Sequence, residues 1–146
     1  MAHKEQQQFF LRVKRKYPQY FKNVNVVSKG HEFKSNTRFD VVMSSECFEH
    51  DMYYDKTILN CLLHLKPGGL FMFSCASTGR AEHGTLRSKP EDAPLLSELD
   101  PEWANYYKNL TQEDIIKVFN PEFVFKEYLF EYNPIACDLY FYGIKF

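Results

Sequence analysis

The sequence predicts an α/β fold, because two apolar strands flank a helix within about forty residues, the length of a βαβ unit. The strands are Phe39–Ser44 and Leu70–Cys75, and the helix is Tyr53–Leu65. Nearly continuous apolar strands are typical of parallel sheets that are covered on both faces. Two aromatic runs near the C-terminus, joined at Asn133-Pro134, predict an antiparallel hairpin. We therefore expect a mostly parallel sheet with an antiparallel C-terminal hairpin.

The elements before the first secure strand are one helix and one short strand. Lys4–Tyr17 carries Phe9, Val13 and Tyr17 at helical spacing, with charged residues on its other faces. Pro18 ends this amphipathic helix. A short β-branched stretch, Asn23–Val27, predicts a strand that Lys29-Gly30 interrupts.

The elements after the βαβ unit are bounded by turn and capping signals. Lys66-Pro67-Gly68-Gly69 predicts the end of the central helix and a turn before the second strand. Ser77–Leu99 is long, polar and rich in Gly and Pro, which favours a functional loop. The remaining expected elements are a short helix at Glu102–Lys108, a helix opened by a Thr111/Asp114 capping box and closed by Asn120-Pro121, and strands at Phe123–Tyr132 and Leu139–Phe146.

Length and composition bound the kind of protein. The 146 residues suit a single domain, 1–146. The 18 Lys+Arg and 19 Asp+Glu give a net charge of −1, so nucleic acid is an unlikely partner. The longest apolar run, around Leu70–Phe73, is far shorter than the ~20 residues that span a bilayer. The four cysteines have no C-x-x-C spacing, and no secretory segment precedes them, so we expect reduced thiols in the cytoplasm.

The six glycines exclude two common phosphate-binding motifs. They stand at positions 30, 68, 69, 79, 84 and 143 and form neither G-x-G nor G-x-x-x-x-G-K. The sequence therefore contains neither the dinucleotide fingerprint nor the P-loop.

Two runs of sequence carry a resemblance to a known family. The run Phe39–His50 (FDVVMSSECFEH), then a helix, then Leu65–Phe73 (LKPGGLFMF), resembles the second half of a class I S-adenosylmethionine-dependent methyltransferase of the type 11 kind. The similarity extends from about Val24 to the end of the chain. It implies a Rossmann-like fold that is incomplete, a truncated methyltransferase-like domain without the N-terminal Gly-rich segment that holds the cofactor.

The resemblance also implies site residues. Ser44, Ser45 and Glu46 would line the methyl-donor pocket, with Glu49 and His50 beside it. Gly30 to Phe33 resembles the stretch against the adenine ring, so that His31, Glu32 and Phe33 are the implied cofactor contacts and His31 replaces the usual acid. The cofactor would be S-adenosylmethionine, and its binding would be weak or lost because the Gly-rich turn is missing.

The residues themselves suggest catalytic candidates. Glu46, His50 and His83 follow strands of the sheet, where α/β proteins bind ligands, and each could accept a proton from an acceptor. The structural alternatives are that His50 caps the next helix or bonds a carbonyl, and that Glu49 stands at a helix N-terminus. Cys47 is expected to be a small buried residue rather than a nucleophile.

The long loop supplies candidates for binding an acceptor. Arg80 and His83 could hold a polar or anionic group, with Tyr106 and Tyr107 as a wall, and the alternative is a solvated loop. No metal site is expected, since convergence of His31, His50, His64 and His83 is not indicated by any spacing.

Two functions remain open at this stage. The first is methyl transfer from S-adenosylmethionine to a small-molecule or saccharide-type acceptor, impaired by loss of the Gly-rich loop. The second is a non-catalytic methyltransferase remnant that acts as a binding module. A sheet that lacks its first strands would expose an edge, so we expect a homodimer unless Asn23–Val27 covers this edge instead.

Overall fold

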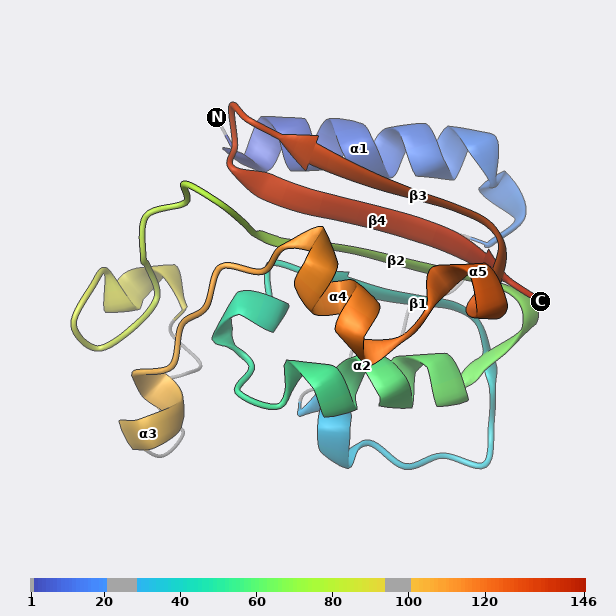
Figure 1. Cartoon of the computed structure of the whole chain (residues 1–146), viewed down its shortest axis with the longest axis horizontal. Coiled ribbons are helices and arrows are strands. Elements are labelled where there is room, and N and C mark those ends of the chain that lie inside the picture. The colour runs from blue at the N-terminus through green and yellow to red at the C-terminus, as the bar shows by residue number, and fades with distance from the viewer. Residues whose placement is uncertain (1, 21–28, 94–100) are drawn as a thin grey trace.

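The computed structural model describes residues 2–20, 29–93 and 101–146 and has an α/β fold. Its four-stranded sheet has the order β1-β2-β4-β3, and helices lie on both faces (Figure 1). The strands are β1 Phe39–Ser45, β2 Leu65–Ala76, β3 Phe125–Asn133 and β4 Asp138–Lys145. The strand expected at Asn23–Val27 lies outside the described residues.

The strand pairing follows the predicted plan in part. β1 and β2 are parallel neighbours, and β3 and β4 form the expected antiparallel hairpin. β4 lies beside β2 in antiparallel orientation, with Leu70 opposite Ile144. One pairing in the described sheet is therefore parallel and two are antiparallel, so the parallel share is smaller than expected.

The K-P-G-G segment differs from its prediction. Lys66 to Gly69 lies inside β2 as a bulge, because Phe39 pairs with Leu65 while Val41 pairs with Leu70. Gly68 has a φ of 75°, a conformation that glycine adopts without steric cost. The segment is thus part of the strand, and β2 starts at Leu65, five residues before its predicted start.

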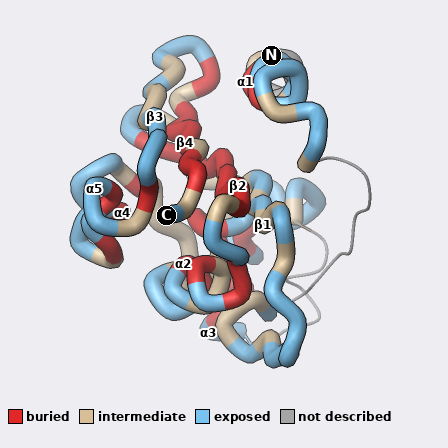
Figure 2. The backbone as a smooth tube through the Cα atoms, turned by 90° about the vertical axis from the view of Figure 1, so that its right-hand side faces the viewer, coloured by how far each residue is buried: buried red, intermediate tan, exposed pale blue. Residues whose placement is uncertain are grey.

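β1 is less buried than its apolar sequence predicts. Within the described part of the chain it is an edge strand, and Met43 is 43% exposed. Figure 2 shows that burial is concentrated in β2 and β4, the two central strands. The prediction of a strand covered on both faces was wrong for β1 and correct for β2.

The helices match most of their predicted positions. They are α1 Ala2–Lys16, α2 Tyr54–Leu63, α3 Pro101–Ala104, α4 Gln112–Val118 and α5 Pro121–Val124. Thr111 and Asp114 form the predicted capping box of α4. The helix expected over Glu102–Lys108 is only the single turn α3. None of the described helices is long and apolar enough to cross a membrane.

Two apolar clusters hold the helices to the sheet. On one face, α2 and α4 contribute Ile58 and Ile115 to a cluster that contains Phe73 and Phe141. On the other face, Phe9 and Val13 of α1 pack against Leu70, Met72, Tyr140 and Ile144. Phe9 stacks on Tyr140 with ring centroids 4.7 Å apart. The sheet is therefore a rigid platform, and the ends of β1 and β2 are fixed relative to each other.

Candidate functional site

The candidate site lies at the carboxyl ends of β1 and β2. Glu46 directly follows β1, and its N–H donates to the Ser74 carbonyl at 2.9 Å. A 3₁₀ turn, Phe48–His50, comes next, and the loop that carries His83 leaves the end of β2. The start of β4 reaches the same end, since Asp138 pairs with Ala76. Three segments distant in sequence thus meet at one end of the sheet (Figure 1).

Glu46 is held in a backbone conformation that is unusual for a side-chain-bearing residue. Its φ is 50°, in the left-handed region that costs roughly 1–2 kcal/mol for an L-residue. Its Oε1 is buried without a hydrogen-bond partner in the described structure. The chain therefore turns sharply at Glu46 and carries the next residues back toward β2.

Glu49 is a fully buried carboxylate. Neither of its carboxylate oxygens has a hydrogen-bond partner among the described residues. Burial raises the pKa of Glu49 well above its usual range, and the negative charge of Glu46 raises it further. The backbone is secured by the Lys108 N–H, which donates to the Glu49 carbonyl at 2.9 Å. The nearby backbone of Glu49 and Ala76 opposes part of this rise in pKa. A rigid backbone thus holds a buried acidic group with no bonded cation in the described structure.

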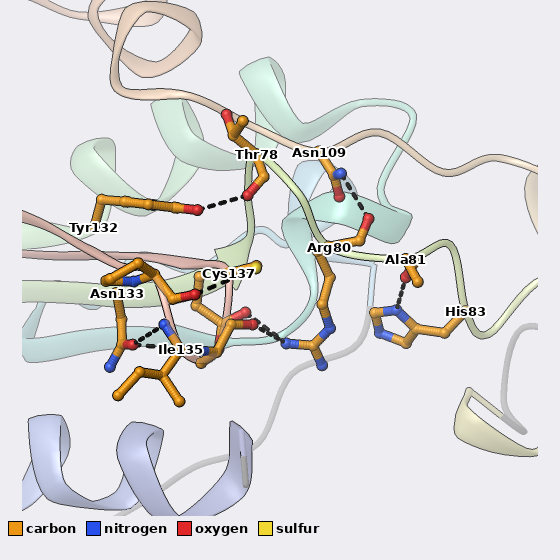
Figure 3. Close-up of polar contacts among 12 residues, drawn as sticks. Thr78, Arg80, Ala81, His83, Asn109, Tyr132, Asn133, Ile135 and Cys137 are labelled. Atoms are coloured by element: carbon orange, nitrogen blue, oxygen red, sulfur yellow. Dashed lines mark hydrogen bonds and ion pairs between the residues drawn. The ribbon is translucent and has the colours of Figure 1, made fainter.

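His50, His83 and Tyr107 form a compact ring cluster next to Glu49. The ring centroids of His50 and His83 are 5.2 Å apart, and those of Tyr107 lie 5.4 Å from His50 and 5.3 Å from His83. The Nδ1 of His83 lies 3.1 Å from the Ala81 carbonyl oxygen, a contact drawn in Figure 3. Burial lowers the pKa of His50 to about 4, with a further contribution from His83. His50 is therefore neutral at pH 7.

Arg80 and Asp138 make a partly buried ion pair beside this cluster. The Arg80 Nη1 donates to Asp138 Oδ1 at 2.7 Å and to the Ala136 carbonyl at 2.9 Å (Figure 3). Asn109 in turn donates to the Arg80 carbonyl at 2.9 Å. Burial raises the pKa of Asp138 to about 7, and the charge of Glu46 adds to this, against the opposing effect of Arg80. The Arg80 guanidinium thus attaches the loop after β2 to the β3–β4 hairpin.

The structure brings some of the predicted site residues together and separates others. Glu46, Glu49, His50, His83 and Tyr107 gather at the carboxyl ends of the parallel strands, whereas Phe33 lies near Phe39 at the opposite end of β1. The Phe33 ring centroid is 6.1 Å from that of Phe39 and 5.1 Å from that of His64.

The other predicted contacts have separate surroundings. His31 packs in a three-ring cluster with Tyr53 and Trp103, whose ring centroids are 4.6 and 5.5 Å away, and Glu32 is exposed. Ser44 and Ser45 pair with Phe73 and Ser74 in the sheet. The Tyr106 N–H donates to the Trp103 carbonyl, and its half-buried side chain has a pKa raised by burial.

Sequence reasoning missed Asp138 and misjudged Cys47. Asp138 is fully buried, and the available signal was a lone acid at the start of the apolar run Leu139–Phe141. Cys47 was expected to be buried, but it is exposed, because the turn after Glu46 directs Phe48 and Glu49 inward instead. Burial of its sulfur region and the nearby Glu49 charge still raise the pKa of the thiol, so Cys47 is not an activated nucleophile.

Two histidines that are distant in the sequence lie close together in the structure. Glu49, His50 and His83 each present one potential ligand atom, and these atoms lie within 4.8 Å of one another. His64 is elsewhere, with its Nδ1 2.9 Å from the Asn60 carbonyl oxygen. The structure therefore brings together two of the four histidines, His50 and His83, whose convergence no spacing in the sequence had indicated.

Comparison with solved structures identifies the fold. The 1,6-didemethyltoxoflavin-N1-methyltransferase of Burkholderia thailandensis, with bound S-adenosylhomocysteine, matches with a TM-score of 0.51 and 17% identity over 91% of this chain and 56% of that one. The phosphoethanolamine N-methyltransferase 2 of Haemonchus contortus, also with S-adenosylhomocysteine, matches with a TM-score of 0.51 and 15% identity over 82% and 36%. The N-methyltransferase NodS of Bradyrhizobium japonicum WM9 has a TM-score of 0.48 and 17% identity over 93% and 61%.

These similarities show that the fold of this chain matches one part of the fold of S-adenosylmethionine-dependent methyltransferases. The chain spans between about a third and two thirds of the length of these proteins, as the coverages show. No protein-family model matches the sequence, and no characterised protein matches it as a relative.

Proposed function

We propose that this chain is a methyltransferase-type domain that binds S-adenosylmethionine weakly and directs its methyl group toward a small-molecule acceptor. The observation that carries the proposal is that Glu46 and the paired rings of His50 and His83 lie at the carboxyl ends of two parallel strands, within a methyltransferase fold. Ligands of open α/β sheets bind at this end, because the strands there diverge into loops. The solved methyltransferases with this fold were crystallised with S-adenosylhomocysteine.

Each group has a defined part in the proposed reaction. The C–S bond of the sulfonium breaks as the acceptor atom bonds to the methyl carbon, and the acceptor loses a proton. Glu46 would lie near the positively charged sulfonium of a bound cofactor, because it directly follows β1 at the end of the sheet where ligands bind. His83 is half-buried and oriented by the Ala81 carbonyl, so it is the candidate that accepts the proton. Tyr107 forms one wall of the acceptor site.

The absence of a Gly-rich turn from the sequence supports weak binding. Backbone N–H groups in such a turn normally approach the cofactor closely, and glycine is needed because a Cβ would collide. The sequence contains no G-x-G, so the cofactor would be held chiefly through its methionine end. The expected affinity for S-adenosylhomocysteine lies between about 0.1 and 1 mM, or about 4–5.5 kcal/mol.

Calorimetric titration with S-adenosylhomocysteine, in a buffer with a chelator, tests this proposal. The Glu46→Gln variant should bind about fivefold more weakly, a loss of roughly 1 kcal/mol. Glu113→Gln, an exposed acid on α4, is the matched control and should bind like the parent protein. Micromolar affinity would contradict the weak-binding part of the proposal. No binding at several millimolar would contradict the cofactor and favour a non-catalytic binding module.

A second copy of the chain is the partner that we propose for the edge of the sheet. β1 has a neighbour on only one side within the described residues, and Met43 is 43% exposed. Such edges are usually covered, because their unpaired N–H and C=O groups accept a further strand. Analytical sedimentation in the tens of micromolar should detect a dimer, and a Met43→Lys variant should remain monomeric. A parent protein that sediments only as a monomer would contradict this part.

A further inference from the structure

The side chains of Glu49, His50 and His83 converge from two separate segments of the chain. Glu49 and His50 belong to the 3₁₀ turn after β1, and His83 belongs to the loop after β2. One ligand atom from each lies within 4.8 Å of the others. In tetrahedral coordination, ligand atoms about 2.0–2.2 Å from a shared ion lie about 3.3–3.6 Å from one another. The side chains must therefore approach one another by up to about 1.5 Å to coordinate one ion.

Several buried polar atoms of this cluster have no hydrogen-bond partner in the described structure. Both carboxylate oxygens of Glu49 and the Nδ1 of His50 are buried with no hydrogen-bond partner in the described structure. An unpaired polar group that is removed from water costs about 1–3 kcal/mol, and a charged one costs more. Asp138 already pairs with Arg80, so that guanidinium is directed at another carboxylate. A bound cation would compensate Glu49.

The surroundings of the two imidazoles resemble those of metal ligands. If the His83 Nδ1 donates its proton to the Ala81 carbonyl, 3.1 Å away, the Nε2 lone pair is free for an ion. Gly84 backs His50 closely, because a Cβ at position 84 would lie 2.7 Å from the His50 Cε1. Tyr107 packs against both rings. The histidines are thus positioned before any ligand arrives.

We propose that Glu49, His50 and His83 form a binding site for a divalent transition-metal ion. Two imidazoles and one carboxylate suit zinc, manganese, iron(II) or cobalt better than magnesium or calcium, which prefer all-oxygen ligands. Three protein ligands leave at least one coordination position open. His83 is only partly buried, so an oxygen of a bound molecule could take that position if it is reached from the His83 side. The site stands on this cluster alone. An ion bound to the His83 Nε2 would occupy the lone pair that the proposed proton transfer uses, so His83 would serve one role or the other.

The test is a metal titration of the untagged full chain after treatment with a chelator and dialysis. Calorimetry with zinc and with manganese, without cofactor, should show one ion per chain with low-micromolar or tighter affinity for zinc. Cobalt(II) should produce visible absorption bands without a thiolate charge-transfer band, because no cysteine is among the proposed ligands. The melting temperature should rise with added zinc, since the ion binds the folded state.

Variants decide which residues bind the ion. Glu49→Gln and His83→Ala should each weaken zinc binding at least tenfold. Glu49→Gln is expected to fold, because it keeps the side-chain shape and replaces an acid whose ionised form is disfavoured by burial. His31→Ala, a half-buried histidine outside the cluster, and Cys47→Ser, an exposed thiol near it, should bind zinc like the parent.

Two results would overturn the metal site. One is no saturable binding of zinc or manganese up to several hundred micromolar by the folded parent protein. The other is one-to-one binding that Glu49→Gln and His83→Ala leave unchanged while Cys47→Ser abolishes it. Binding of S-adenosylhomocysteine is measured separately with a chelator present, so failure of the cofactor proposal leaves this result intact, and the reverse also holds.

Discussion

The charges between α1 and β3 and the charges at the carboxyl ends of β1 and β2 are arranged in opposite ways. On the α1 side, Arg12 pairs with Glu131 at 2.9 Å, and Lys16 contacts Glu127, with all four side chains at least one-third exposed. At the strand ends, Glu49 and Asp138 are fully buried, and Arg80 is the one cation bonded to either of them in the described structure. The exposed charges are balanced, and the buried ones are not.

The difference indicates what each set of charges does. Exposed ion pairs lie in a high-dielectric environment, where they contribute little to the free energy of unfolding and carry only a small desolvation penalty. Buried carboxylates pay a large desolvation penalty, which apolar residues of similar size would avoid. Retention of Glu49 in the interior without a bonded cation in the described structure therefore points to a ligand that compensates it, whereas the α1 pairs only hold a helix against the hairpin.

The largest expected effect concerns Asp138. Its pKa is about 7 in the folded protein and 3.8 in the unfolded chain, so the folded state holds the proton more tightly. Stability from this group is full below pH 4 and is lost as the pH rises to about 7, by up to about 4 kcal/mol at 1.36 kcal/mol per pKa unit. Asp138→Asn is neutral at every pH, so the parent protein should lose stability relative to this variant over that range.

Urea denaturation of both proteins from pH 4 to 8, with a chelator present, measures the difference. His50 has a lowered pKa and affects stability in the opposite direction as the pH falls, but it is present in both proteins and cancels. A free-energy difference between the two proteins that does not change with pH would show that Asp138 is ionised throughout. The ion pair with Arg80 would then be sufficient to keep the buried Asp138 carboxylate ionised.

A smaller effect is expected from glycine substitutions. Gly84 has a φ of 65°, and an added Cβ would lie 2.7 Å from both His50 and Ala93. Gly68 has a φ of 75° with nothing within 4 Å of an added Cβ, so it is a matched control. Gly68→Ala should cost about 1–2 kcal/mol of unfolding free energy through backbone strain alone.

Gly84→Ala should cost about 1 kcal/mol more than this control, because the neighbouring side chains must also move. Thermal denaturation gives both values. The variant should also shift the NMR signals of His50 and weaken zinc binding, whereas Gly68→Ala should do neither. Equal effects of the two substitutions would show that His50 is free to move away, so that the cluster is not preorganised.

The smallest effect is expected at the exposed ion pair of α1. A double-mutant cycle with Arg12→Ala and Glu131→Ala should give a coupling free energy below about 1 kcal/mol, decreasing with added salt. The cycle is needed because Arg12 also lies over the Phe9 ring, at 5.6 Å from its centroid. Urea denaturation at two salt concentrations measures it. A coupling of several kcal/mol would mean that the two charge sets differ less than their exposure indicates.

Local signals predicted the elements that local interactions form. The Thr111/Asp114 capping box is a contact within one helical turn, and it is present as predicted. The aromatic tail alternates around a short turn, and it forms the hairpin of β3 and β4. Hydrophobic periodicity likewise located α1 and α2 to within a few residues.

Long-range pairing produced the differences. Lys66 to Gly69 carries strong turn signals, yet it lies within β2, because Leu65 pairs with Phe39 before the bulge and Leu70 pairs with Val41 after it. The apolar β1 sequence indicated a central strand, whereas its position in the sheet depends on which strands pair with it. Phe33 lies away from Glu46 for the same reason, since its contacts are with the other end of β1.

By itself, the sequence determined the fold class, the positions of α1, α2 and α4 to within a few residues, and the presence of acids and histidines after two strands. It did not indicate α5, Pro121–Val124, where a helix end and a strand were predicted. Only the tertiary structure decided that Glu49 and His50 meet His83, that Asp138 joins them from the start of β4, and that His31 and His64 lie elsewhere. The physical reason is that helix periods and caps depend on residues a few positions apart. Convergence at a sheet end depends on strand order and register, which no short stretch of sequence encodes.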